Sequence, residues 1–175
     1  MRRGAMWVLA LAAMVGAAAA VRPGWPAGAE TGAPAWHSYH NDRYGTTIDY
    51  PDIFKAEPPP DNNDGRKFMA ADGAEFSVYA SYNSLDFDLA EFHDFTIKNL
   101  DPKATVTYQA RGKDWFVVSG TNGGSIFYER ETLSHKAQMT EGFLMTYPSS
   151  LKQTYDPIVA RMTKSFRSGT GFQSP

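Results

Sequence analysis

The fold is decided by residues 105–147, TVTYQARGKDWFVVSGTNGGSIFYERETLSHKAQMTEGFLMTY. Three segments of this stretch are rich in β-branched and aromatic residues: Thr105–Arg111, Trp115–Thr121 and Ser125–Leu133. They are separated by breaks at 112–114 and 122–124, both of which contain glycine. Glycine supplies the positive φ that tight hairpin turns need, so these breaks predict two consecutive β-hairpins.

The first two segments differ in the cover they need. In the first, Val106, Tyr108 and Ala110 alternate with polar residues, which is typical of a strand with one face in water. Trp115–Val118 has no polar position, so we expect a central strand that is covered on both faces. Replacing Trp115 by alanine should then cost about 3–5 kcal/mol, as the truncation of a core aromatic does.

Turn residues and periodicity predict the remaining elements. Asp88 stands three residues before Glu91, which indicates the start of a helix. Ser149 or Ser150 is expected to cap a second helix, which Asp156-Pro157 either restarts or kinks. Further strands are predicted at 36–41, 46–50, 66–71, 74–82 and 138–147, with a polar loop at 56–65. This order predicts an α+β fold, an antiparallel sheet of hairpins with a helix on each face.

Composition narrows the classes of partner and chemistry. The chain has 175 residues, a formal net charge of −2 and no cysteine. One domain with a real core is the expected organisation. A near-neutral charge without basic clusters argues against nucleic acid or an anionic membrane as the main partner. Without cysteine there is no disulfide and no thiol nucleophile.

The N-terminus predicts export. Arg2-Arg3 precede an apolar run from Met6 to Val15 and small residues that end at Ala20, the pattern of a signal peptide. Cleavage after Ala27-Gly28-Ala29 is a later alternative, and an uncleaved membrane anchor is disfavoured because a span prefers ~20 apolar residues. We therefore expect a periplasmic or secreted protein without stable membrane insertion after cleavage. The expected organisation is a signal peptide at 1–20, a disordered linker at 21–35, the domain at 36–167 and a disordered tail at 168–175.

Four motifs in this domain resemble those of one family. They are Tyr39-x-Asn41-x-Arg43-Tyr44-Gly45, Asn63-Asp64-Gly65-Arg66-x-Phe68, Trp115-Phe116-Val117-Val118-Ser119-Gly120 and Phe143-x-x-x-Tyr147-Pro148. Over about residues 36–167, the chain resembles small exported bacterial proteins of the PsbP/DcrB-like superfamily. The resemblance implies an α/β/α sandwich without shared catalytic residues, whose members act mostly by binding other macromolecules.

Residue patterns that carry chemistry are weak in this sequence. The loop Asp61-Asn62-Asn63-Asp64-Gly65 is the best metal candidate, but Ala71 stands where a calcium loop needs glutamate. Its Asx residues are equally typical of turns. Glu129 and Glu131 would lie on one face of a strand, where they could act as acid and base if buried; a solvated edge is the usual outcome. We predict no catalytic residue, metal or cofactor.

A partner surface is expected from two groups of residues. Tyr79, Tyr82, Phe116 and Phe127 are predicted at outward positions of the sheet, unless helix packing hides them. Asp61, Asn63 and Asp64 belong to the polar loop, and loops on a rigid scaffold often carry function. The sequence thus favours an exported, non-catalytic binding or accessory protein of the cell envelope, with another envelope protein as partner. The alternative is a small secreted hydrolase that uses carboxylates.

Overall fold

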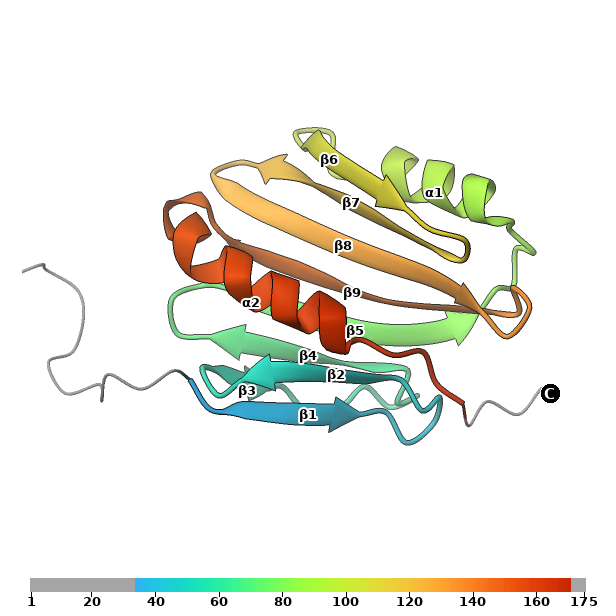
Figure 1. The fold of residues 1–175 in the computed structure, drawn as a ribbon, viewed down its shortest axis with the longest axis horizontal. Helices are drawn as coiled ribbons and strands as arrows, with labels where there is room; N and C mark the ends of the chain where they lie inside the picture. The colour runs from blue at the N-terminus through green and yellow to red at the C-terminus, as the bar shows by residue number, and fades with distance from the viewer. Residues whose placement is uncertain (1–33, 171–175) are drawn as a thin grey trace, which may run out of the picture. The chain divides into compact units, whose positions relative to one another are not determined.

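The computed structural model describes residues 34–170, which form a seven-stranded sheet, a two-stranded sheet and two α-helices (Figure 1). In chain order the elements are β1 (Trp36–His40), β2 (Thr47–Pro51), β3 (Phe54–Ala56), β4 (Gly65–Ala70), β5 (Glu75–Tyr82), α1 (Leu89–Lys98), β6 (Thr105–Arg111), β7 (Trp115–Asn122), β8 (Ser125–Ser134), β9 (Met139–Pro148) and α2 (Lys152–Ser165). The predicted signal peptide, most of the predicted linker and the end of the predicted tail lie outside the described residues.

The central strand of the large sheet is β9. Its strands are antiparallel and follow the order β3-β4-β5-β9-β8-β7-β6, while β1 and β2 pair with each other. The prediction that Trp115–Val118 is central is therefore wrong: β7 lies next to the edge strand β6, because the β4–β5 hairpin joins the sheet beside β9. Cover on both faces is nevertheless confirmed, since Phe116, Val117 and Val118 are all buried. The short edge strand β3 was not predicted.

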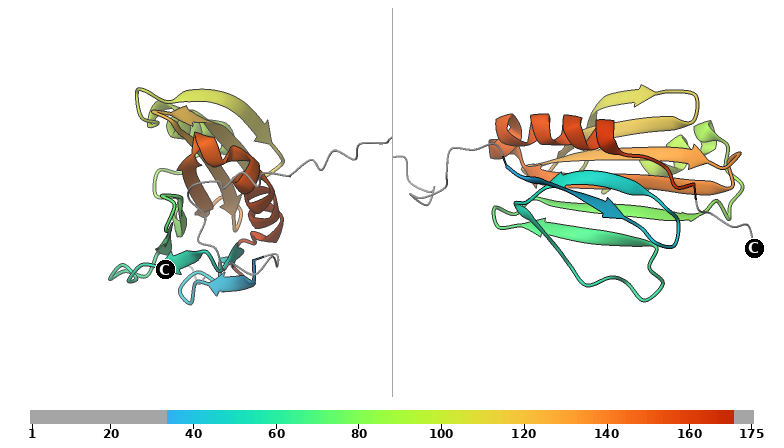
Figure 2. Two further views of the ribbon diagram at one scale, coloured as in Figure 1. Left: turned by 90° about the vertical axis from the view of Figure 1, so that its left-hand side faces the viewer. Right: turned by 60° about the horizontal axis from the view of Figure 1, so that its bottom comes forward.

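Each helix covers one face of the seven-stranded sheet, which confirms the predicted α+β architecture. α2 packs through Ile158 and Met162 against the face that carries Phe143. Figure 2 shows the helix lying along one face of the sheet. α1 packs on the opposite face, where the rings of Phe92 and Phe116 lie 5.3 Å apart. Neither helix has the length and apolar character that crossing a membrane requires, within residues 34–170.

The two helices begin differently. α1 starts with the predicted capping box: the Asp88 carboxylate accepts hydrogen bonds from two backbone N–H groups, and the Glu91 carboxylate accepts one from the backbone of Asp88. At α2, Ser149–Leu151 form a 3₁₀ turn directly after β9, and no side chain caps the helix. The predicted serine cap is wrong because both serines lie before the N-cap residue. Pro157 lies inside α2, so the helix does not restart there.

A register shift in the β6–β7 ladder separates Val106 from Tyr108. Val106 pairs with Gly120, and Tyr108 pairs with Ser119. Val106 packs beneath α1 beside Phe116, whereas Tyr108 lines a groove on the α2 face. The predicted alternation of these two residues on one face is therefore wrong, because the extra residue in the bulge changes the face that the strand presents.

Residues Arg167–Gly169, which we name the C-terminal strap, are held against the sheets. Arg167 forms an isolated antiparallel bridge with Thr47. The backbone N–H of Gly169 donates to the buried Glu141 carboxylate at 3.0 Å, and His135 Nε2 lies 2.8 Å from the carbonyl oxygen of Gly169. Gly169 is buried, although the sequence placed it in a disordered tail. The buried position of Gly169 depends on contacts with Glu141 and His135, which are distant in the chain, so local composition does not reveal it.

Candidate functional site

The candidate site is a pocket between α1 and its face of the sheet, which we name the α1 pocket. It has a volume of about 580 Å³. Phe92 and Phe95 of α1, and Leu100 just after it, form the wall on the helix side. The floor comes from the sheet and includes Tyr79 of β5, Glu129 and Glu131 of β8, Phe127 of β8 and Leu144 of β9. α1 packs chiefly on β7, and the pocket lies beside the helix over β8, β9 and β5.

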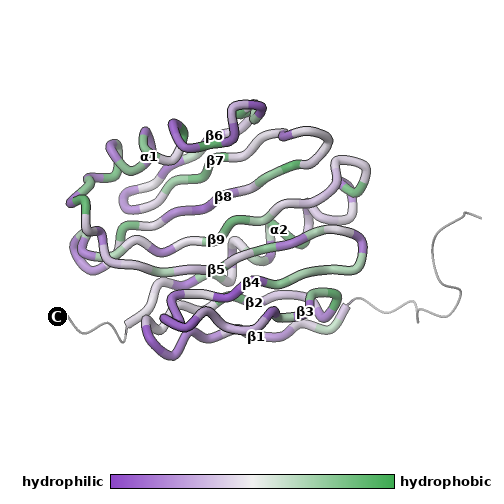
Figure 3. The backbone as a smooth tube through the Cα atoms, turned by 180° about the vertical axis from the view of Figure 1, so that it is seen from behind, coloured by the Kyte–Doolittle hydropathy of each residue, from purple (hydrophilic) through white to green (hydrophobic). Residues whose placement is uncertain are grey.

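A pair of carboxyl groups occupies the floor. The Tyr79 hydroxyl donates to Glu131 Oε1 at 2.6 Å and lies 3.4 Å from Glu129 Oε1. Glu131 is 3% exposed, and its Oε2 has no hydrogen-bond partner among the described residues. Figure 3 shows the hydrophilic middle of β8 between more hydrophobic ends. A buried acceptor without a partner is costly, so this oxygen is the least satisfied polar atom of the floor.

Glycine at position 142 makes room for this carboxyl. Gly142 of β9 pairs with Glu131 across the ladder. A Cβ at this position would lie 2.4 Å from Glu131 Oε2 and 2.5 Å from the Arg130 carbonyl oxygen. Any larger residue would therefore displace the Glu131 side chain from the floor.

Burial determines the titration of the floor groups. Burial, followed by the charge of Glu129, raises the pKa of Glu131 well above its ordinary value. Burial also raises the pKa of Glu129, and hydrogen bonds to its carboxylate, first from Glu131 and then from Tyr79, oppose this rise. The pKa of Tyr79 is raised well above its ordinary value, chiefly by burial and then by the two carboxyls. Glu131 is thus the carboxyl of the pair whose proton is held more strongly.

The burial of Glu129 and Glu131 is greater than the sequence predicted. The pair was predicted to lie on a solvated edge, yet β8 has β7 on one side and β9 on the other, and α1 shields the face that carries both residues. The condition that the sequence set for acid–base chemistry, burial, is therefore met. The available signal was the position of Ser125–Leu133 between two other predicted strands, Trp115–Thr121 and 138–147, which is compatible with an interior strand.

The four aromatic residues predicted to form one surface lie in three different environments. Tyr79 and Phe127 come together on the floor of the α1 pocket. Phe116 is 1% exposed beneath α1, so its predicted outward position offers no surface, because the helix packs directly on it. Tyr82 is 37% exposed and packs edge-on against Tyr44, outside the lining of the pocket.

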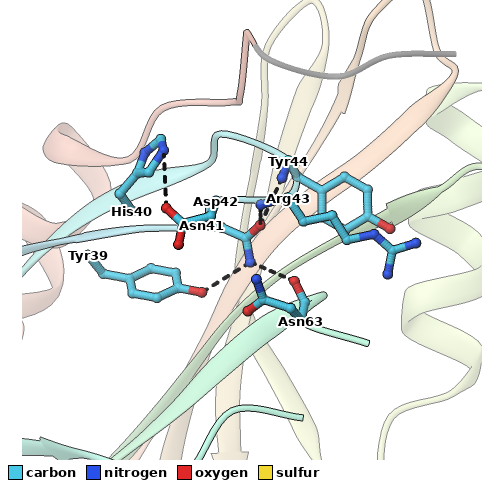
Figure 4. A network of polar contacts seen from close by, with 7 residues as sticks. All are labelled: Tyr39, His40, Asn41, Asp42, Arg43, Tyr44 and Asn63. Atoms are coloured by element: carbon cyan, nitrogen blue, oxygen red, sulfur yellow. Dashed lines mark hydrogen bonds and ion pairs between the residues drawn. The ribbon is translucent and has the colours of Figure 1, made fainter. Parts of the chain in front are cut away.

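The polar loop at 56–65 takes part in a second cluster of hydrogen bonds, which lies at the end of β1. Asn41 is buried, and its side-chain NH₂ donates to the carbonyl oxygen of Asn63 at 3.0 Å (Figure 4). Its Oδ1 accepts from the backbone N–H groups of Arg43 and Tyr44. The loop is therefore tied to the β1–β2 turn by these hydrogen bonds.

The acidic residues of that loop do not converge. Asn62 Nδ2 donates to Asp64 at 2.6 Å, whereas Asp61 is exposed. Within residues 34–170, no group of three or more His, Asp or Glu side chains is arranged to hold a metal ion. The loop has the geometry of a structural turn, and its proposed role as a contact surface stays a prediction.

The opposite face has a groove of about 630 Å³ between α2 and β6. Tyr108, which is 55% exposed, and Tyr128 line it, with Lys152 and Asp156 of α2. The Tyr128 hydroxyl accepts a hydrogen bond from Thr163 at 3.1 Å. None of the buried polar atoms without a partner lines this groove. The α1 pocket is therefore the better candidate for a binding site.

Comparison with known proteins gives a result at the level of the fold. No protein-family model matches the sequence, and no curated protein matches it. The solution structure of cyanobacterial PsbP (CyanoP) from Synechocystis sp. PCC 6803 is similar, with a TM-score of 0.58 and 15% identity over 79% of this chain and 95% of that chain. The Saccharomyces cerevisiae Ran-binding protein Mog1p is similar with a TM-score of 0.54 and 11% identity, over 78% of this chain and 96% of that chain.

Likeness at these identities concerns the fold alone. The resemblance to DcrB that the sequence motifs indicated stays a prediction. The sheet order, the two covering helices and the similarity over most of each solved structure agree with one another. The described residues of this chain therefore have a PsbP-like fold.

Proposed function

We propose that this chain is an exported, non-catalytic binding or accessory protein of the cell envelope, and that its binding site is the α1 pocket. The observation that carries the proposal is the Glu131 carboxyl, which is buried at the floor of an accessible pocket with one oxygen unpartnered. Export rests on the signal-peptide pattern of residues 1–20. The Ran-binding protein Mog1p has the same fold, which supports a protein partner by analogy.

Binding accounts for this pocket better than catalysis does. The hydroxyls of Ser81 and Thr140, both in the lining, lie 2.8 Å from each other, and neither has a described hydrogen bond to a carboxylate of the floor. No His or Lys occurs among the described lining residues. A hydroxyl nucleophile needs a base within hydrogen-bond reach, which Ser81 and Thr140 lack. The Tyr79 hydroxyl does contact Glu131, but its pKa is raised well above the ordinary value, which disfavours the nucleophilic phenolate.

Photo-crosslinking in intact cells tests the proposal. A benzophenone amino acid at Phe95, which is 44% exposed on the pocket wall, should capture one reproducible envelope protein. The same probe at Tyr108, on the opposite face, is the matched control and should not. N-terminal sequencing of the chain from the envelope fraction should begin after Ala20. Equal crosslinks from both positions, or an intact leader in a cytosolic protein, would exclude the proposal.

A second candidate function is a hydrolase that uses carboxylates. One observation favours it: Glu129 and Glu131 are both buried and their pKa values are both raised, the second more strongly. The purified chain should then hydrolyse activated glycosides or esters, and Glu131→Gln should abolish the turnover. Absence of turnover in the parent protein would exclude this function and leave the binding function in place.

A further inference from the structure

The charge of the α1 pocket has one sign. Its described lining contains the carboxyl groups of Glu129, Glu131 and Asp101, and contains no Lys, Arg or His. A concave site with one sign of charge and a low-dielectric wall attracts ligands of the opposite sign. We propose that the α1 pocket binds an organic cation, a primary ammonium on an apolar stem, with Glu129 and Glu131 as its counter-charge. This inference rests on the proposed function, because it names the ligand class of the same site.

The floor matches the hydrogen bonds of an ammonium group. An ammonium carries three N–H donors and no acceptor, so it needs several oxygen acceptors close together. Glu131 Oε1 is engaged by Tyr79, whereas Oε2 lies enclosed over Gly142 without a partner, so the Glu131 side chain would turn toward the pocket to accept a donor from the ligand. Glu129 contributes the second carboxyl within reach of the same Tyr79 hydroxyl. A cationic donor would therefore satisfy Glu131 Oε2, which among the described residues is the buried side-chain atom of the pocket lining that lacks a partner.

The walls select an organic cation over a metal ion. Phe92, Phe95 and Leu100 on the helix side, with Phe127 and Leu144 on the sheet side, present apolar and aromatic surface. Such surface packs against a hydrocarbon stem, and aromatic faces attract an ammonium directly. A metal ion would leave these walls without a partner, and the described residues hold no cluster of three acidic or His ligands.

Binding is coupled to release of a proton. The groups that face Glu131 are Glu129 on its own strand, Tyr79 on β5 and Asp101 after α1, while β9 contributes only uncharged residues to the pocket. Burial raises the pKa of Glu131 well above its ordinary value, which favours the protonated carboxyl in the empty pocket. An incoming ammonium favours the ionised carboxylate, and that proton leaves to the solvent. Affinity should therefore rise with pH until the amine itself loses its proton near pH 10.

Calorimetric titration of the purified chain tests the inference. The probe is 2-phenylethylamine, and its neutral counterpart 2-phenylethanol is the matched ligand control. We expect the amine to bind, the alcohol to bind at least about tenfold more weakly, and protons to be released on binding of the amine, measured from titrations in phosphate and in HEPES, neither of which is a primary amine. Equal binding of amine and alcohol, or no binding of the amine, would overturn the inference.

Three variants test whether amine binding depends on the carboxyl groups of the pocket floor. Glu131→Gln should weaken amine binding at least about tenfold and remove the proton release. Glu75→Gln is the control, because Glu75 lies on the same sheet face but outside the pocket lining, in an ion pair with Lys67. Thr140→Lys should block the pocket by supplying an internal ammonium, which keeps the test decisive if Glu131→Gln misfolds. Unchanged binding in folded Glu131→Gln or in Thr140→Lys would contradict the proposal.

The natural ammonium has two sources, a free amine or a lysine side chain of the partner protein. An Nα-acetyl-lysine methylamide probe separates them, with its Nζ-acetylated form as control. Tighter binding of the lysine probe than of 2-phenylethylamine indicates a presented side chain, and the reverse indicates a free amine. If no amine binds while the Phe95 crosslink persists, the proposed function stands and the ligand class is wrong. If amines bind without a crosslink, the protein partner is wrong and the ligand class stands.

Discussion

Glu131 links the stability of this protein to pH. In the unfolded chain its carboxyl should lose a proton near the ordinary pKa of about 4.3. In the folded protein burial raises this pKa well above that value, so the folded state holds more protons in the interval between the two values. The free energy of unfolding is therefore highest below the unfolded-state pKa, where both states are protonated, and it falls as pH rises toward the folded-state pKa.

Glu131→Gln should remove this pH dependence, because glutamine resembles the protonated carboxyl and cannot ionise. The variant is expected to gain free energy of unfolding relative to the parent as pH rises above the ordinary carboxyl pKa of about 4.3, at up to about 1.4 kcal/mol per pH unit while the parent titrates. Urea denaturation at several pH values measures the difference. Glu75→Gln, at a solvent-accessible ion pair, is the control. Parallel profiles for parent and Glu131→Gln would show that Glu131 is ionised throughout.

β7 shows how a strand can be covered without being central. Phe116, Val117 and Val118 alternate between the two faces and are all buried. Trp115 lies at the beginning of the strand and is only partly buried, with the Arg130 guanidinium 4.9 Å from its ring. The stability of the element should therefore depend on the middle of the strand rather than on its first residue.

Phe116→Ala should cost about 3–5 kcal/mol, because the ring is enclosed by α1 and the sheet. Trp115→Ala should cost less than Phe116→Ala, since part of the indole is already in water, and this revises the value expected from the sequence. Chemical denaturation of both variants compares the two free energies. A larger loss for Trp115→Ala would mean that the end of β7, and not its middle, is the core of this layer.

The hairpins were predictable as elements because their turns are local. Asp72-Gly73 and Asn122-Gly123-Gly124 specify two reversals, and Gly73, Gly123 and Gly124 all have the positive φ that such turns require. The capping box at Asp88 was equally local. The bulge between Val106 and Tyr108 was not, because it depends on what each face of β6 meets in the folded sheet.

At the level of the whole molecule, the C-terminal strap joins the two sheets. Its Arg167 forms a β-bridge with Thr47 of β2, and its Gly169 donates a hydrogen bond to the carboxylate of Glu141 on β9. Without the strap, Glu141 would be a buried carboxyl that lacks these donors, and such a group is costly. The strap is thus expected to stabilise the packing of the β1–β2 hairpin against the rest of the domain.

Gly169→Ala should destabilise the protein by about 1–3 kcal/mol, because the added Cβ would lie 1.7 Å from the carbonyl oxygen of Tyr44. Thermal and urea denaturation measure the loss, and hydrogen exchange should show faster opening of β1 and β2. Thr170→Ala, one residue further on and exposed, should stay within about 0.5 kcal/mol of the parent. Equal stability of the two variants would mean that the strap contributes nothing.

The amino-acid sequence alone determined the hairpins, the start of the first helix, the apolar stripe of the second and the α+β class, since turns, caps and periodicity act between near neighbours. Only the tertiary structure decided that β9 is central, that Phe116 lies under a helix and that Glu129 and Glu131 are buried beside Tyr79. These outcomes depend on which strands become neighbours and how far α1 reaches across them. Pairing between residues that are distant in the chain leaves no short-range signal, so the candidate site emerged with the fold.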